Sequence, residues 1–297
     1  MIPITAEIRA MIDKAASSLT VGEDEYTDPA DGLLHCRACG HPRQAVVEAP
    51  FLNRVIFPRC ACPCEVEKRQ CREEARIRQE RLERIKRRRS QGLQARYLYD
   101  YTFANDSGEN PAMDKIRAYV EGWQTARERN VGLLLFGDVG TGKSFAAGCI
   151  ANALLEQDIP VLMTNFSTIL NRLCGTFGED RLTFLDGLDV YDLLIIDDLG
   201  VERSTEYAME QIYTIIDSRY RSNKPLIVTT NLTLEEMKNP PDLARARIYD
   251  RILERCAPVL FAGKNFRKDN AAVTRTAARE IIAQGAGVHP AERKEHP

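Results

Sequence analysis

The chain lacks any apolar run that could cross a membrane. Its longer apolar runs, such as Leu193–Ile196, are only a few residues long, whereas a helix that spans a bilayer needs about 20 apolar residues. The first residues, Met1–Glu7, also lack the basic segment and apolar core of a secretory signal. We therefore expect a cytoplasmic protein that has no membrane partner.

Net charge is nearly absent as well, since the 297 residues carry 41 Lys and Arg against 43 Asp and Glu. This overall balance hides a local excess of positive charge, because residues 65–96 hold twelve Lys or Arg and six Glu. The segment has no Pro and no β-branched run, so we predict a long helix. Its positive charges either meet the phosphate backbone of a nucleic acid or form a solvated surface with i,i+4 ion pairs such as Glu65 with Arg69.

Disulfides are not expected, because cytosolic proteins seldom keep them, yet the chain has nine cysteines. Three of these, Cys149, Cys174 and Cys256, lie in apolar or helical sequence, which is typical of small core residues. The other six gather in the first quarter of the chain: Cys36, Cys39, Cys60, Cys62, Cys64 and Cys71. Thiols clustered in this way need an explanation other than packing.

The clustered cysteines are spaced like zinc ligands. A C-x-x-C knuckle is followed about 20 residues later by three alternating cysteines, and two thiolate pairs at this separation can close a tetrahedral Zn²⁺ site. A redox C-x-x-C is the rival interpretation, but no strand–helix pattern surrounds it and the second cluster would stay unexplained. We predict a structural zinc ion on Cys36, Cys39, Cys62 and Cys64, with Cys60, Cys71, His35 and His41 as alternative ligands.

A complete phosphate-binding motif, G-x-x-x-x-G-K-S, stands near the middle of the chain. The apolar run Val131–Phe136 before it suits a buried strand, and Phe145–Leu155 after it suits a helix. In this context Lys143 would reach the β- and γ-phosphates, and the Ser144 hydroxyl would bind Mg²⁺. The context disfavours the alternative of a glycine-rich turn that binds nothing. We predict a nucleoside triphosphate site formed by Gly137, Asp138, Val139, Gly140, Thr141, Gly142, Lys143, Ser144 and Phe145.

Apolar and helical segments alternate beyond the loop in the order of a doubly wound α/β domain with a parallel sheet. Strands are expected at 161–164, 193–197, 226–230 and 259–262, and helices at 113–129, 167–174, 205–220 and 243–256. The aromatic segment Tyr97–Phe103 either packs or reaches the nucleotide base. The predicted organisation is a zinc-binding domain at 1–70, a basic helical linker at 71–96, an ATPase domain at 97–270 and a flexible tail at 271–297.

Polar side chains follow two of the expected strands. Asp197 and Asp198 end one apolar run and Asn231 ends the next, and ligands gather at this edge of a parallel sheet. Asp197 suits a partner of Mg²⁺, reached through water, and Asp198 suits the group that polarises the attacking water. Asn231 would hold that water or contact the γ-phosphate, unless it only ends the strand as a turn former. The pattern predicts hydrolysis of the nucleotide.

Several arginines lie on the expected helix 243–256. Arg247, Arg251 and Arg255 share one stripe of this helix because they are spaced four residues apart. An arginine presented to a neighbouring subunit could stabilise transition-state charge, while a salt-bridged surface is the alternative. The residues alone leave this open.

Three segments together resemble one family. The loop Gly137–Ser144, the segment Tyr191–Gly200 and the strand Pro225–Asn231 are similar to the AAA+ ATPases of the DnaC/DnaI helicase-loader and IstB transposition-helper group, over about residues 97–268. The cysteine cluster followed by a charged helix resembles the prophage-type loaders, which carry an N-terminal zinc-binding domain.

The resemblance implies ATP as the nucleotide, a P-loop AAA+ fold with helices on both faces of the sheet, and several roles. The N-terminal domain of such loaders docks on the replicative helicase, while the ATPase domain assembles as a spiral and binds single-stranded DNA. Asn231 corresponds to the family's sensor and Arg251 to its arginine finger. Arg267 corresponds to a second sensor in Gly263–Arg267, where Asn265 replaces the usual Ser.

Three functions follow as hypotheses. The first is an ATP-dependent helicase loader with slow hydrolysis, favoured by the zinc module and its basic helix. The second is a transposition helper that shares the same ATPase chemistry. The third is a P-loop kinase that phosphorylates a small molecule, but the chain shows no clear arginine-rich lid or acceptor pocket. Asp198 beside Asp197 favours water as the nucleophile.

Overall fold

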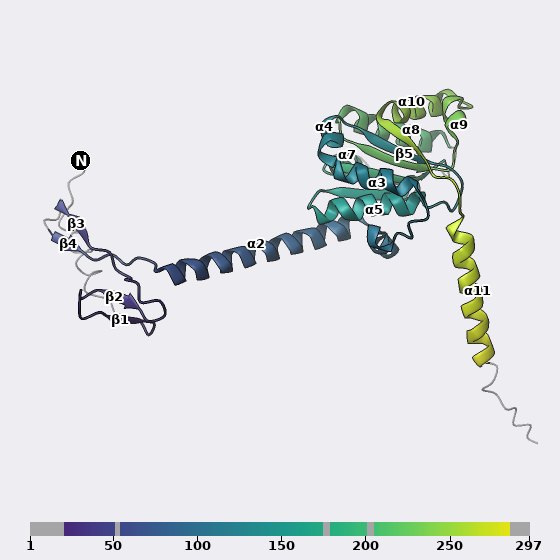
Figure 1. The fold of residues 1–297 in the computed structure, drawn as a ribbon. Coiled ribbons are helices and arrows are strands. Elements are labelled where there is room, and N and C mark those ends of the chain that lie inside the picture. Colours follow the sequence, from purple (N-terminus) through teal and green to yellow (C-terminus); the bar gives the residue numbers. More distant parts are fainter. Residues whose placement is uncertain (1–20, 51–53, 175–178, 201–204, 286–297) are drawn as a thin grey trace, which may run out of the picture. The chain divides into compact units, whose positions relative to one another are not determined.

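The computed structural model describes residues 21–50, 54–174, 179–200 and 205–285 (Figure 1). The chain divides into two compact units, residues 1–82 and residues 83–297. Among the described residues, no helix has both the length and the apolar character to cross a membrane.

The first unit is built from two short antiparallel ladders. In one, β1 (Glu25–Thr27) pairs with β2 (Leu34–Cys36), and in the other, β3 (Val47–Ala49) pairs with β4 (Arg54–Ile56). The buried apolar side chains described here are few: Leu34, Cys36, Ala49 and Cys62. So small a core supplies little hydrophobic stabilisation, and domains of this kind usually need a metal or disulfides.

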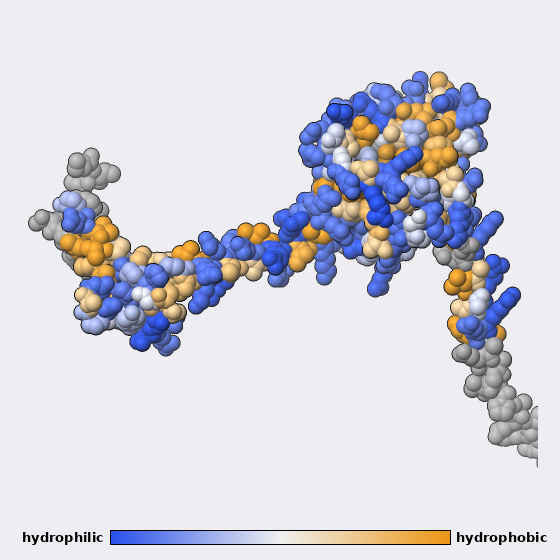
Figure 2. Space-filling view, viewed as in Figure 1, coloured by the Kyte–Doolittle hydropathy of each residue, from blue (hydrophilic) through white to orange (hydrophobic). Residues whose placement is uncertain are grey.

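The predicted long helix is α2 (Pro63–Gly92), which begins in the first unit and ends in the second. Figure 2 shows mostly hydrophilic residues along it. The expected pair forms, with Arg69 Nη2 lying 2.5 Å from Glu65 Oε1. Near its end, Arg84 and Arg88 both pair with Asp158 of the second unit, at 2.5 and 2.8 Å. The last turns of α2 are therefore part of the ATPase unit.

The second unit holds a five-stranded sheet whose pairings are all parallel, in the order β6-β7-β8-β5-β9. The strands are β5 (Gly132–Phe136), β6 (Val161–Asn165), β7 (Leu193–Leu199), β8 (Leu226–Thr230) and β9 (Cys256–Leu260). The strands β5 to β8 are largely buried apolar runs, as a sheet covered on both faces requires, whereas the edge strand β9 buries only Cys256 and Val259. The predicted doubly wound α/β fold is confirmed.

Helices cover both faces of this sheet (Figure 1). One hydrophobic cluster joins it to α3 (Ala112–Glu121), α4 (Trp123–Glu128) and α5 (Lys143–Glu156). The other joins it to α6 (Phe166–Cys174), α7 (Glu179–Leu188), α8 (Glu206–Arg221), α9 (Leu234–Lys238) and α10 (Leu243–Arg255). Along β5, Leu133 and Leu135 belong to the first cluster and Leu134 to the second, which is the alternation of a strand buried on both sides.

Two expected elements differ from the structure. The last strand runs over Cys256–Leu260 instead of 259–262, because it takes its register from β5, with Cys256 opposite Gly132. The helix expected at 113–129 is divided at Gly122 into α3 and α4. Two short 3₁₀ turns, η2 (Arg96–Asp100) and η3 (Phe103–Asn105), precede them. The short helices α7 and α9 were not expected.

The first part of the tail predicted at 271–297 is helical, since α11 runs over Phe266–Gly285. Its sequence is rich in Ala and Arg and reaches its first glycine only at Gly285, so its helix propensity is high. The remainder of that predicted tail, residues 286–297, lies outside the described residues.

Removing the buried side chain of Leu93 is expected to destabilise the ATPase unit. Leu93 follows α2, forms a parallel bridge with Met163 at the edge of the sheet, and is 1% exposed. We expect Leu93→Ala to lower the free energy of unfolding by about 2–5 kcal/mol, measured by urea unfolding. Leu82→Ala is the matched control, because Leu82 lies within α2 and is 61% exposed. Equal stability of the two variants would show that the unit begins after residue 96.

Candidate nucleotide site

The phosphate loop joins the end of β5 to the start of α5, as predicted. Gly137 has φ of 133°, and a Cβ built on it would lie 2.2 Å from the carbonyl oxygen of Phe261. Only glycine fits there, because it tolerates this conformation and leaves room for the neighbouring strand. The helix α5 then begins directly at Lys143. Its free N–H groups and its dipole make an anion-binding site of this turn.

Lys143 is held over the loop. Its Nζ donates to the carbonyl oxygens of Gly137 and Asp138, at 2.8 and 2.7 Å. Burial lowers the pKa of Lys143, while the carboxylate of Asp198 opposes this shift. A buried ammonium that is bonded to neutral carbonyl oxygens gains from a phosphate partner, because charge-assisted hydrogen bonds are the stronger kind.

The two carboxylates stand at the end of β7, where its register against β8 shifts between Ile196 and Leu199. Asp198 has φ of 59°, and its N–H donates to Thr229 Oγ1 at 2.9 Å. The same hydroxyl donates to Asp197 Oδ1 at 2.6 Å. The buried Thr229 hydroxyl thus bonds to the carboxylate of Asp197 and to the backbone N–H of Asp198, at the irregular end of the strand. Thr229 was not among the predicted site residues, although a hydroxyl inside an apolar strand was a usable signal.

Asp197 and Ser144, the two residues predicted to bind magnesium, are hydrogen-bonded to each other. Burial raises the pKa of Asp197, while hydrogen bonds from Thr229 and Ser144 act to lower it. A hydroxyl and a carboxylate side by side at a phosphate loop are oxygen ligands of the kind that Mg²⁺ prefers. The arrangement fits the ion that the loop would bind together with a nucleotide.

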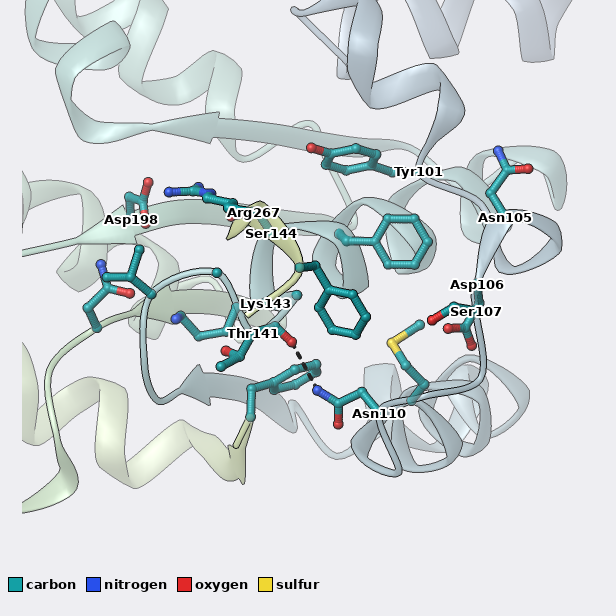
Figure 3. A pocket seen from close by; sticks show the side chains of 18 residues that line it. Tyr101, Asn105, Asp106, Ser107, Asn110, Thr141, Lys143, Ser144, Asp198 and Arg267 are labelled. Atoms are coloured by element: carbon teal, nitrogen blue, oxygen red, sulfur yellow. Dashed lines mark hydrogen bonds between the residues drawn. The ribbon is translucent and has the colours of Figure 1, made fainter. Parts of the chain in front are cut away.

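A cavity of about 510 Å³ opens over the loop (Figure 3). This volume lies within the usual range for small-molecule sites, about 300–1,000 Å³. The predicted site residues that line it are Val139, Gly140, Thr141, Gly142, Lys143, Ser144, Phe145, Asp198, Asn231 and Arg267. Gly137 and Asp138, at the start of the loop, do not line the cavity, and their carbonyl oxygens accept hydrogen bonds from Lys143 Nζ. The structure thus brings together residues from four separate stretches of the chain.

The segment before β5 supplies the other wall of the cavity, and it includes part of the aromatic segment Tyr97–Phe103 that was predicted either to pack or to reach the nucleotide base. The Tyr101 ring packs against that of Phe145 with 5.3 Å between the ring centroids, so this aromatic both packs and lines the cavity. Asn110, only 9% exposed, donates from Nδ2 to the carbonyl oxygen of Thr141 at 2.9 Å. Asp106 lines the same wall. A wall of aromatic and amide groups suits a flat heterocyclic base.

Arg251 lies elsewhere and does not line the cavity. It pairs with Asp217 of α8 and lies over the ring of Tyr213, with 4.6 Å between the guanidinium carbon and the ring centroid. Arg255 lies 4.6 Å from the centroid of Tyr220 in the same way. Within one chain, then, these arginines stabilise the packing of α10 on α8, and the role of Arg251 as a finger stays a prediction.

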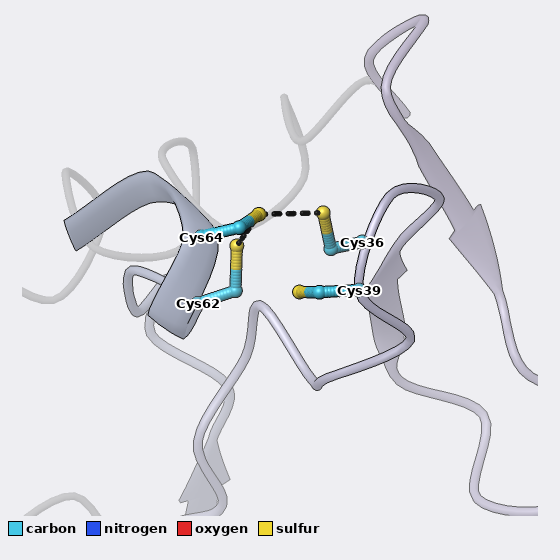
Figure 4. Close-up of side chains that lie close together, drawn as sticks. All are labelled: Cys36, Cys39, Cys62 and Cys64. Carbon is cyan, nitrogen blue, oxygen red and sulfur yellow. Dashed lines mark hydrogen bonds between the residues drawn. The ribbon is translucent and has the colours of Figure 1, made fainter. Parts of the chain in front are cut away.

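The first unit contains a second candidate site, a cluster of four cysteines (Figure 4). The sulfur atoms of Cys36, Cys39, Cys62 and Cys64 all lie within 4.8 Å of one another. Two of the separations are 3.3 Å, between Cys62 and Cys64, and 3.6 Å, between Cys36 and Cys64. A tetrahedral site with Zn–S bonds of about 2.3 Å needs sulfurs about 3.8 Å apart. The cluster is compatible with zinc.

The alternative ligands are placed differently. Cys60 is exposed and its Sγ points to the carbonyl oxygen of Pro42 at 3.6 Å. Both ring nitrogens of His35 are engaged, with Gly40 O and Asp31 Oδ2, each at 2.9 Å. Among the described residues, the four predicted cysteines are the group arranged to hold a metal.

The phosphate loop, the paired carboxylates and the parallel sheet define a P-loop nucleotide-binding protein of the AAA+ type. The sequence profile described as IstB-like ATP binding protein matches residues 66–274, and the chain belongs to this family. The predicted family and its nucleotide, ATP, are confirmed.

Individual proteins are also similar to this chain. The chain is 34% identical over 149 residues to the replicative helicase loader DnaC of Escherichia coli (strain K12), which covers 49% of this chain and 58% of that protein. It is 26% identical over 147 residues to the replicative helicase loader DnaI of Bacillus subtilis (strain 168), covering 46% and 47%. The chain thus spans about half the length of these relatives. A crystal structure of the DnaC helicase loader aligns with a TM-score of 0.49 and 23% identity, over 57% of this chain and 100% of that one.

Proposed function

We propose that this chain is a cytoplasmic ATPase that binds a replicative helicase and single-stranded DNA and loads the helicase, with slow hydrolysis of ATP. The observation that carries the chemistry is the convergence of Ser144, Asp198, Asn231 and Arg267 on one cavity above the phosphate loop. The relatives named as replicative helicase loaders support the biological role.

The hydrolytic step is assigned to the residues at the end of the sheet. Asp198 polarises a water molecule, and Asn231 beside it orients that water towards the γ-phosphate. Mg²⁺, when bound at Ser144 and through water at Asp197, would neutralise charge on the β- and γ-phosphates. Lys143 exchanges its carbonyl partners for phosphate oxygens. Arg251 acts as a finger on a neighbouring subunit when copies of the chain assemble in a spiral or another oligomer.

The first unit is the proposed helicase-docking module, and its fold rests on zinc. The four sulfurs are placed for that ion, and Zn²⁺ binding is worth more than the small core can supply. Exposed apolar side chains gather on and beside β3 and β4 (Figure 2): Val46, Val47, Val55 and Phe57, which are 41–59% exposed. An apolar surface on a small domain is typical of a protein-binding site.

A second candidate is a transposition helper, which the family's own description favours because it is named after IstB. Such a protein would keep the same nucleotide site and differ in its partner. The two functions therefore differ in the partner that the chain binds and not in the binding and hydrolysis of ATP.

Retention on the immobilised cognate replicative helicase tests the leading function. We expect the full chain to be retained and Phe57→Asp to bind at least about tenfold more weakly, since a buried aromatic anchor at an interface is worth about 2 kcal/mol or more. Val190→Asp, which changes an exposed apolar residue of the second unit, is the matched control. Retention of residues 83–297 alone would contradict docking through the zinc module, and retention on an immobilised transposase but not on the helicase would favour the second candidate.

A further inference from the structure

The turn between β9 and α11 is tied to the phosphate loop. The Nδ2 of Asn265 donates to the carbonyl oxygen of Val139 at 2.9 Å. The next residue, Phe266, donates its backbone N–H to the carbonyl oxygen of Gly140 at 2.9 Å. Two successive residues of the turn thus bond to two successive residues of the loop. The first bond joins positions 126 residues apart in the chain, so it belongs to the tertiary fold.

The same Asn265 side chain also caps α11. Its Oδ1 accepts the backbone N–H groups of Arg267 at 3.1 Å and Lys268 at 3.3 Å. Asparagine is one of the preferred capping residues, because its side-chain oxygen satisfies N–H groups that the first turn of a helix leaves free. One amide therefore bonds to the loop through its nitrogen and to the helix through its oxygen.

The fit between the turn and the loop is close. A Cβ built on Gly140, whose φ is 83°, would lie 2.2 Å from Asn265 Oδ1. The loop and the amide therefore pack in direct contact at this point. Arg267, two residues beyond Asn265, lines the cavity above the same loop (Figure 3).

We propose that Asn265 is a positioning residue, which fixes the guanidinium of Arg267 relative to the phosphate loop so that this arginine contacts the γ-phosphate. The proposal rests on the proposed function, because it assigns a role within the same ATP site. The amide is needed because it supplies a donor and an acceptor on one planar group. A serine could cap α11, but its short side chain would not also hold Val139.

The consequence is a preference for ATP over ADP that depends on Asn265. An arginine that is held in place gains a charge-assisted hydrogen bond to the γ-phosphate, which ADP lacks. Without the bond to Val139, the first turn of α11 is free to shift, and Arg267 loses its fixed distance to the loop. The affinity for ADP, which uses the loop and Lys143, changes much less.

Equilibrium dissociation constants for ADP and for a non-hydrolysable ATP analogue test this in the full-length chain. We expect Arg267→Ala to reduce the preference for the ATP analogue by about tenfold or more, and Asn265→Ala to reduce it by a similar factor. The double variant should lose no more than Arg267→Ala alone, because the two residues act as one unit. Additive losses, or an unchanged preference in either single variant, would overturn the proposal.

Asn265→Ser and Thr205→Ala separate positioning from helix capping. The serine variant keeps a cap on α11 and should lose the preference as fully as the alanine variant, so it also serves if Asn265→Ala folds poorly. Thr205 caps α8 by accepting the N–H of Ala208 and has no part in the cavity, so its loss should lower the melting temperature without changing the preference. A serine variant with the full preference would refute the role of the Val139 bond.

The affinity readout is independent of turnover. If the chain binds both nucleotides but does not hydrolyse ATP, the proposed function is refuted. The nucleotide preferences of the Asn265 and Arg267 variants would still test the positioning role. Conversely, normal hydrolysis with an unchanged preference in Asn265→Ala would refute the positioning role alone.

Discussion

Replacing Asp198 by asparagine is expected to lower ATP turnover by at least about 100-fold, since a positioned general base contributes about 10²–10⁴ to the rate. Affinity for ATP should stay within about threefold, because the loop and Lys143 that bind the phosphates are unchanged. Asparagine is the suitable replacement because Asp198 has φ of 59°, and asparagine tolerates this left-handed conformation where most residues are strained. The bond from its N–H to Thr229 also survives.

Asp192→Asn is the matched control for this experiment. Asp192 stands just before β7, at the opposite end of the strand from Asp198, where it pairs with Arg127 at 3.0 Å. The variant makes the same change from carboxylate to amide next to the same strand, and it should leave turnover unchanged. Steady-state turnover combined with titration of nucleotide binding gives both quantities. Turnover within about threefold of the native chain would remove Asp198 from the hydrolytic step.

The parts of the nucleotide site that consist of consecutive residues could be predicted from the sequence. The loop Gly137–Ser144 and the carboxylates near the end of β7 were both predicted, because an apolar run that ends in residues of fixed composition is a local pattern. Asn110 and Asn265 could not be assigned in this way. Their bonds to Thr141 and Val139 join positions 31 and 126 residues apart, and they exist only once the strands have been ordered in the sheet.

In the fold, too, local patterns were predicted and features set by distant contacts were not. The strands at 161–164, 193–197 and 226–230 were located closely, because each is an apolar run bounded by polar residues. The last strand was displaced by three residues at its start, since Cys256 takes its place from the pairing with Gly132 and not from its own hydrophobicity. The helix α11 was not predicted, because the composition of residues 271–297 was taken to indicate a flexible tail. The helix propensity of residues 266–285 was the better indicator.

Removal of zinc is expected to unfold the first unit while the ATPase unit stays folded. The described part of the first unit buries few apolar side chains, of which Leu34 is the largest, whereas structural zinc contributes about 10–16 kcal/mol to small metal-dependent domains. We therefore expect the native chain to hold one zinc ion and to lose helicase binding on chelation, with ATP turnover retained. Hydrogen exchange should become fast across residues 21–62 and remain slow in the sheet β5–β9.

Point variants identify the thiols that bind zinc. Cys62→Ser removes a buried sulfur of the cluster and should abolish zinc binding, measured as metal content after dialysis. Cys60→Ser is the matched control, because Cys60 lies two residues away in the same motif but is exposed and outside the cluster. Loss of zinc in both variants would mean that Cys60 is a ligand. Retention of zinc and of slow exchange in Cys62→Ser would mean that the first unit folds by its apolar contacts alone, which its small core makes physically difficult.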